Sequence, residues 1–170
     1  MATVEVWRGN IVEAPADAIV NAANSSLAAG GGVCGVIFKA AGYQKLQAAC
    51  DELNGCKTGS AKVTPAFDLE SRGIKHIIHA VGPRWRESEP DTTDALLEGA
   101  YLASLAIAEE KGISTIAFPM ISTGIFGFPK DRASAIAVRV ARSHVGNLDK
   151  ILLVAYDEED ETFLKNALGQ

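Results

Sequence analysis

Three consecutive glycines, Gly30 to Gly32, stand just before a cysteine, Cys34, in the segment AAGGGVCGVIF. Glycines let backbone N–H groups come close to a phosphate, and a helix that begins directly after them adds the positive end of its dipole. The apolar run that follows predicts such a helix from about Val33. The segment therefore indicates an anion-binding loop with a thiol in its middle.

The same glycines match the pattern G-x-G-x-x-G of dinucleotide-binding proteins, through Gly30, Gly32 and Gly35. That pattern indicates an NAD site when it directly follows a strand and an acidic residue ends the next strand. Here several residues separate the predicted strand from the glycines, and Asp51 and Glu52 fall inside a predicted helix. The context disfavours NAD and leaves a phosphate-binding loop.

A second loop, ISTGIFGFP, offers hydroxyl and N–H groups from Ser122, Thr123 and Gly124. Two neighbouring loops of this kind suit two phosphates, as in a pyrophosphate. Phe126 and Phe128 in this loop are open to two interpretations. Phenylalanine most often packs in a core, but Phe126 could equally form an apolar wall that faces a ligand.

Other catalytic patterns are weak. The sequence lacks the G-x-S-x-G of α/β-hydrolases. His76 and His79 would point to opposite faces of a strand, so they cannot share a metal ion, and we expect no metal site. We predict that His79 is a core histidine and that His144 lies on the surface. We also predict that two cysteines are buried as small apolar groups, Cys50 and Cys56.

The composition is that of an ordinary globular protein, with 48% apolar and 22% charged residues in 170. No apolar run approaches the ~18 residues of a membrane span, and the N-terminus does not resemble a signal peptide. Three cysteines without metal-type spacing are typical of the reducing cytoplasm. The net charge of −5 argues against a sequence-independent nucleic-acid binder.

Strands and helices alternate along the chain. Apolar and β-branched runs predict strands at 4–7, 17–23, 58–65, 75–83, 114–120 and 150–156. Helical spacing predicts helices at 33–41, 43–53, from Asp91 or Thr92 to 110, at 130–144 and at 157–169. This alternation indicates one α/β domain over 1–170 with a largely parallel sheet covered on both faces. In such folds ligands bind beyond the carboxyl ends of the strands, where both glycine loops and the segment AYDEED are predicted to lie.

Together these segments resemble the macrodomain family: RGNIVEAPADAIVNAAN, GGGVCGVIFKAAG, CKTGSAKVTPAF, HIIHAVGP and IAFPMISTGIFGFP. Their order and spacing agree over nearly the whole chain. The resemblance implies a three-layer α/β/α sandwich on a mixed, mostly parallel sheet of about six strands. It is nearest to the bacterial branch that hydrolyses ADP-ribosyl links and O-acetyl-ADP-ribose. The ligand implied by the resemblance is ADP-ribose or O-acetyl-ADP-ribose, and the implied protein partner is an ADP-ribosylated protein. The resemblance implies no cofactor.

The resemblance also implies a ligand-binding set, which comprises Asn10, Ile11, Asn21, Asn24, Gly31, Gly32, Val33, Cys34, Ser122, Thr123, Gly124, Ile125, Phe126, Tyr156 and Asp157. In this set residue 10 would meet the adenine amino group, and Tyr156 would stack on adenine. The loop from Ser122 would hold the pyrophosphate. The implied catalytic residues, at the distal ribose, are Asn24, Cys34 and Phe126.

Two residues depart from the family pattern. Asn10 stands where the family usually has aspartate, so we expect weaker adenine recognition, because a hydrogen bond to a neutral group is weaker than one to a charged group. Cys34 stands where hydrolases of this branch commonly have a catalytic aspartate. The thiol could act as a base or nucleophile, or it could only line the pocket while the substrate's phosphate activates water. In the third interpretation catalysis is lost and a binding module remains.

Overall fold

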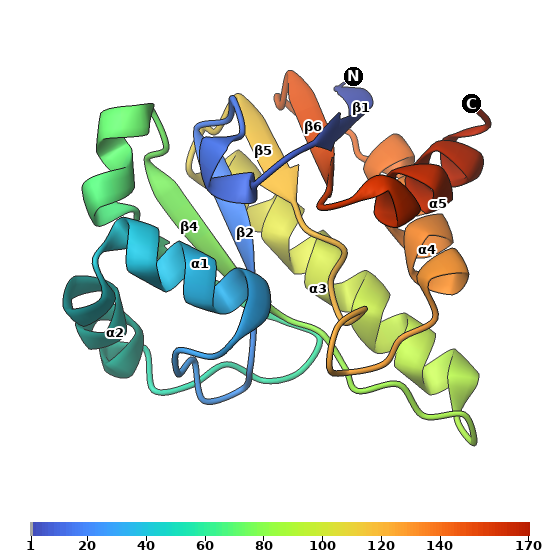
Figure 1. Ribbon diagram of the computed structural model, residues 1–170, viewed down its shortest axis with the longest axis horizontal. Coiled ribbons are helices and arrows are strands. Elements are labelled where there is room, and N and C mark those ends of the chain that lie inside the picture. Colours follow the sequence, from blue (N-terminus) through green and yellow to red (C-terminus); the bar gives the residue numbers. More distant parts are fainter. Residues whose placement is uncertain (1) are drawn as a thin grey trace.

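The computed structural model describes residues 2–170, and within them six strands form one mixed sheet (Figure 1). The strands are β1 (Thr3–Arg8), β2 (Ala18–Ala23), β3 (Ala61–Pro65), β4 (His76–Val81), β5 (Thr115–Phe118) and β6 (Lys150–Ala155). Their order is β1-β6-β5-β2-β4-β3, and the edge strand β3 alone among them pairs antiparallel. The predicted mixed, mostly parallel sheet is confirmed.

Helices cover both faces of this sheet. They are α1 (Gly32–Ala41), α2 (Tyr43–Glu52), α3 (Pro90–Glu110), α4 (Lys130–Ser143) and α5 (Glu158–Leu168). Successive β2 residues belong to different cores, because side chains alternate along a strand. Ile19 packs in the core with α1 and α2, and Val20 packs in the core with α3, α4 and α5 (Figure 1). The described residues form the predicted three-layer sandwich, and no helix among them is long and apolar enough to cross a membrane.

Three predictions about local structure were wrong. Helix α3 begins at Pro90 with Glu89 as its N-cap, not at Asp91 or Thr92, because proline's fixed φ and missing N–H suit the first helical position. The strand predicted at 58–65 begins only at Ala61. No secondary structure was predicted for two segments that form short 3₁₀ helices, η1 (Ile11–Glu13) and η2 (Phe67–Arg72).

The third wrong prediction placed His144 on the surface. Its side chain is only 12% exposed, and its Nε2 lies 2.9 Å from Oε1 of Glu109. The same carboxylate accepts hydrogen bonds from the backbone N–H groups of Asn147 and Leu148. His144 is therefore part of a contact that joins the end of α3 to the turn before β6, which spacing along α4 could not reveal.

The carboxyl ends of β2, β5 and β6 lie at one edge of the sheet, because these strands run parallel. This edge brings together three segments that are far apart in the sequence: 22–36, 119–130 and 154–160. Tyr101 of α3 supports the middle one. Its buried hydroxyl donates to the carbonyl of Pro119 and accepts from the N–H of Ile121, both at 3.3 Å.

His79 is fully buried in β4, as predicted for a core histidine. Its Nδ1 lies 3.1 Å from Nδ2 of Asn21, and its Nε2 lies 3.0 Å from Oγ1 of Thr64. Cys50 contacts the same Nε2 at 3.8 Å, and Cys50 and Cys56 are both buried, as predicted. Burial lowers the pKa of His79 to about 4, so the imidazole is neutral near pH 7.

Replacing Tyr101 by Phe is expected to lower the free energy of unfolding by about 1–3 kcal/mol, because the buried N–H of Ile121 would lose its acceptor. Urea denaturation measures this difference. Tyr43→Phe is the matched control, since that ring is 57% exposed. An equal loss in both variants would contradict the assigned role of the Tyr101 hydroxyl.

Burial of neutral His79 predicts that stability falls as the pH falls from 6.5 towards 4. In this range the histidine binds a proton in the unfolded state but not in the folded state, so protonation stabilises the unfolded state. Below pH 4 the loss should reach roughly 3 kcal/mol. The measurement compares unfolding free energies of wild type, His79→Gln and the control His76→Gln across this pH range. Equal slopes in wild type and His79→Gln would contradict the prediction.

Candidate functional site

A cavity of about 680 Å³ opens at the carboxyl edge of the sheet. This volume lies in the range of ligand pockets. The predicted site residues line it, with the exception of Asn21. The structure adds lining residues outside the predicted ligand-binding set, namely Gly9, Ala22, Ala23, Gly30, Val36, Gly82, Pro119, Met120, Ile121, Lys130, Val154 and Asp160.

The glycine loop forms one wall of this cavity. Helix α1 begins at Gly32, and its N-cap Gly31 makes no side-chain capping bond, so the first N–H groups of the helix lack side-chain partners. Gly32 has φ +58°, a conformation that side chains disfavour. A Cβ at Gly35 would approach the carbonyl oxygen of Gly30 to 2.8 Å, so the loop must fold tightly onto the helix. The wall therefore presents backbone donors at a helix N-terminus.

The loop 121–129 forms the facing wall. Its residue Ser122 has φ +69° and is buried, and within the described residues its Oγ has no hydrogen-bond partner. Such strain and an unpaired buried oxygen are rare in a fold unless the site uses them. The carbonyl of Ser122 accepts from the N–H of Phe128 at 2.9 Å, and Thr123 Oγ1 donates to the carbonyl of Met120 at 2.8 Å. These bonds hold the loop in a compact shape with its 122–126 segment at the cavity.

The two phenylalanines of this loop have different positions. Phe126 lines the cavity, and the guanidinium carbon of Arg84 lies 4.7 Å from the centre of its ring. Phe128 is 2% exposed and packs against Trp85, with ring centres 4.9 Å apart. Phe126 is thus the wall residue and Phe128 the core residue.

Asn24 lines the cavity at the end of β2, and its side chain closes the loop after it. Its Oδ1 accepts from the N–H of Ala28 at 3.0 Å and from the hydroxyl of Ser26 at 2.8 Å. Its Nδ2 donates to the carbonyl of Ala28 at 3.0 Å. Asn24 therefore shapes the loop that leads into the glycines.

Cys34 lies at the bottom of the glycine wall and is 6% exposed. Its Sγ is 3.7 Å from Nδ2 of Asn21 and 3.9 Å from the carbonyl of Ala28. Asn21 is 1% exposed and lies beneath the cavity lining, where the same amide also contacts His79. The thiol therefore meets an amide N–H, and the imidazole of His79 lies on the other side of that amide.

The end of the cavity beside β1 and β6 is formed by Ile11, Val154 and Tyr156, the last of them 71% exposed. Asn10 caps the 3₁₀ segment η1, since its Oδ1 accepts from the N–H of Val12 at 3.2 Å. The N–H of Ile11 stands at the first position of η1, where no partner within the segment exists. This end can hold a flat ring and offers it polar groups at one side.

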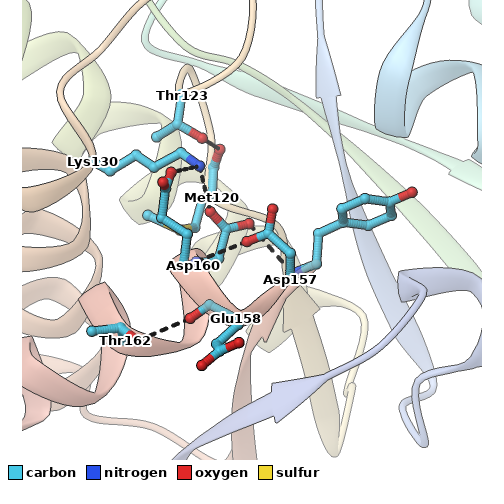
Figure 2. A network of polar contacts seen from close by, with 9 residues as sticks. Met120, Thr123, Lys130, Asp157, Glu158, Asp160 and Thr162 are labelled. Atoms are coloured by element: carbon cyan, nitrogen blue, oxygen red, sulfur yellow. Dashed lines mark hydrogen bonds and ion pairs between the residues drawn. The ribbon is translucent and has the colours of Figure 1, made fainter.

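Figure 2 shows an ion-pair network at this end, which the sequence analysis missed. Lys130 Nζ lies 2.7 Å from Glu159 Oε1 and 2.9 Å from Asp160 Oδ1, and these two carboxylates raise the pKa of Lys130. Asp157 caps α5, because its Oδ1 accepts from the N–H of Asp160 at 2.9 Å. The acidic start of α5 was visible in the sequence, but its partner was not, because Lys130 lies about 30 residues earlier on another helix.

Comparison with known proteins identifies relatives of the whole chain. Residues 20–137 match the Macro domain family. A macro domain-containing protein of Ralstonia nicotianae is 47% identical over 99% of this chain and 95% of its own length. The O-acetyl-ADP-ribose deacetylase of Escherichia fergusonii is 42% identical over 98% and 96% of the two chains.

A solved structure shares the fold over nearly the whole chain. This mutant macrodomain of Oceanobacillus iheyensis, solved with ADPR, superposes with a TM-score of 0.89 at 34% identity. The superposition covers 98% of this chain and 90% of the other. With sequence and architecture in agreement over nearly its full length, the chain belongs to the Macro domain family.

Proposed function

We propose that the cavity binds ADP-ribose, with the diphosphate between the glycine wall and the loop 122–126. The observation that carries this proposal is the pair of backbone-lined walls that face one cavity, one of them at the N-terminus of α1. Backbone N–H groups and a helix dipole can hold an anion without basic side chains. This suits a protein with a net charge of −5.

The two ends of the cavity suit the two ends of such a ligand. The end formed by Ile11, Val154 and Tyr156 fits a flat purine, and the end near Asn24 and Cys34 fits the distal ribose. The Oδ1 of Asn10 already accepts a hydrogen bond from the N–H of Val12. An aspartate at this position would have a second carboxylate oxygen for an adenine amino group, so Asn10 is expected to recognise adenine more weakly. The solved relative with ADPR and the relative named as a deacetylase support this ligand class.

We further propose that the chain hydrolyses an ester or glycosidic bond at the distal ribose, as in O-acetyl-ADP-ribose or an ADP-ribosylated side chain. In the ester reaction a water oxygen bonds to the acetyl carbon, the bond from that carbon to the ribose oxygen breaks, and acetate and ADP-ribose leave. The ligand's phosphate accepts a proton from the attacking water and returns a proton to the departing ribose oxygen, and the acetic acid that forms ionises in water. The glycine wall and Phe126 hold the ribose and diphosphate so that this water faces the acetyl carbon.

Within this mechanism Cys34 lines the pocket. A nucleophilic or basic cysteine normally has an adjacent base, but the Cys34 thiol is buried between an amide and a carbonyl. The alternative function is a binding module that does not turn its ligand over, and it is favoured by the lack of a carboxylate at residue 34.

Calorimetric titration with ADP-ribose is expected to show saturable 1:1 binding, and incubation with O-acetyl-ADP-ribose is expected to release acetate faster than buffer alone. Mono-ADP-ribosylated protein is the second substrate to test. Absence of saturation up to millimolar ADP-ribose would refute the ligand assignment. Saturable binding with background rates for both substrates would instead establish the binding module.

Substitutions at Cys34 separate its possible roles. Cys34→Ala should leave turnover within about threefold of wild type, whereas Cys34→Asp should raise it about tenfold or more, because a carboxylate there can orient water and Asn21 Nδ2 can donate to it. ADP-ribose affinity, measured in parallel, controls for damage to the pocket. Loss of turnover in Cys34→Ala with affinity intact would make the thiol the base and contradict the lining role.

A further inference from the structure

Lys130 holds a position that its own helix does not favour. It is the first residue of α4, and a cation at a helix N-terminus opposes the helix dipole. Its stem borders the cavity, and among the described residues that line the cavity it carries the only basic side chain. Its ammonium group contacts Glu159 and Asp160 in the first turn of α5, and Figure 2 shows Lys130 beside Asp160. The Lys130 side chain is only 28% exposed. The favourable interactions of Lys130 at this position therefore come from the two carboxylates of α5 and not from its own helix α4.

Asp160 connects the same contact to the end of the cavity that fits a purine. Its side chain is 12% exposed, with Oδ1 on Lys130 and Oδ2 accepting from the N–H of Tyr156 at 3.3 Å. Its own N–H donates to Oδ1 of Asp157. One carboxylate thus joins Lys130 to the backbone of the segment 155–157.

The two segments joined in this way bind different parts of the proposed ligand. Lys130 directly follows the loop 121–129, which would hold the diphosphate, and Asp160 holds the segment 155–157, which would hold the base. Away from the cavity, α4 and α5 are joined differently, by apolar packing that includes Leu164 and by a bond from Arg142 to the carbonyl of Leu168. The ion pair is the polar connection at the cavity edge.

We propose that Lys130 is a positioning residue that, through Asp160, fixes the distance between the diphosphate-binding loop and the base-binding segment. A ligand bound to one segment then has its other end held close to the second segment. The second contact therefore forms at a high effective concentration. Fragments that occupy one segment alone gain nothing from the fixed distance. This inference rests on the proposed binding of ADP-ribose and concerns how the chain favours the whole ADP-ribose molecule over its parts.

The test measures the affinity of Lys130→Met for three ligands: ADP-ribose, adenosine and inorganic pyrophosphate. Methionine keeps the apolar stem and removes the charge. We expect ADP-ribose affinity to fall about tenfold, within the usual range of coupling between sites, while the affinities of both fragments stay within twofold. Calorimetry suits ADP-ribose, and chemical-shift titration suits the weak fragments.

Three further variants sharpen the result. Lys130→Arg keeps both ion pairs and should keep ADP-ribose affinity within about threefold of wild type. Asp160→Asn should reproduce the selective loss, and its effect should not add to that of Lys130→Met, because both break one contact. Lys45→Met removes a 2.6 Å ion pair with Asp68 outside the cavity and is the matched control.

Each other outcome overturns the inference. Unchanged ADP-ribose affinity in Lys130→Met would show that the distance does not depend on this residue. Weaker pyrophosphate binding would show that the lysine attracts the phosphates by its charge. An equal loss for all three ligands, with a lower melting temperature than Lys45→Met, would show a purely structural role. If wild type binds fragments and ADP-ribose equally well, the coupling is absent, and if it binds no ADP-ribose at all, the proposed function fails with it.

Discussion

The site depends on one constraint: parallel strands deliver all their carboxyl ends to one edge of the sheet. At this edge the chain turns from strand into helix, and the first N–H groups of α1 remain without partners inside the helix. The loop after β5 reaches the same cavity, held from below by Tyr101. Because backbone N–H groups carry positive potential, the cavity of an acidic chain suits an anion even though Lys130 is the one basic residue among the described residues that line it.

The polar layer under the cavity shows how a cysteine fits at residue 34. Asn21 lies between Cys34 and the neutral His79, and its amide contacts both. A cysteine needs few hydrogen bonds from such a layer, because sulfur is a weak hydrogen-bond partner. The same amide could serve a carboxylate, so the surroundings of residue 34 do not by themselves exclude either residue type.

The end of the cavity beside α5 combines opposite charges over a short stretch. Four acidic residues open α5 and favour its N-terminus, namely Glu158, Glu159, Asp160 and Glu161. Lys130 pairs with two of these carboxylates, Glu159 and Asp160, and thereby joins α4 to α5. The acidic residues that suit the N-terminus of α5 thus also hold a cation that the N-terminus of α4 does not favour.

The sequence by itself determined most of the strands and helices and the two glycine-rich loops, because strand and helix periodicities and glycine-rich turns are local properties. It also indicated that His79 is buried. Only the tertiary structure decided which groups meet: Tyr101 with Ile121, Lys130 with Asp160, and Asn21 with Cys34. It likewise placed Phe126 in the cavity wall and Phe128 in the core. Such pairs join residues that are distant in sequence, and their geometry depends on how the layers pack, which no short pattern encodes.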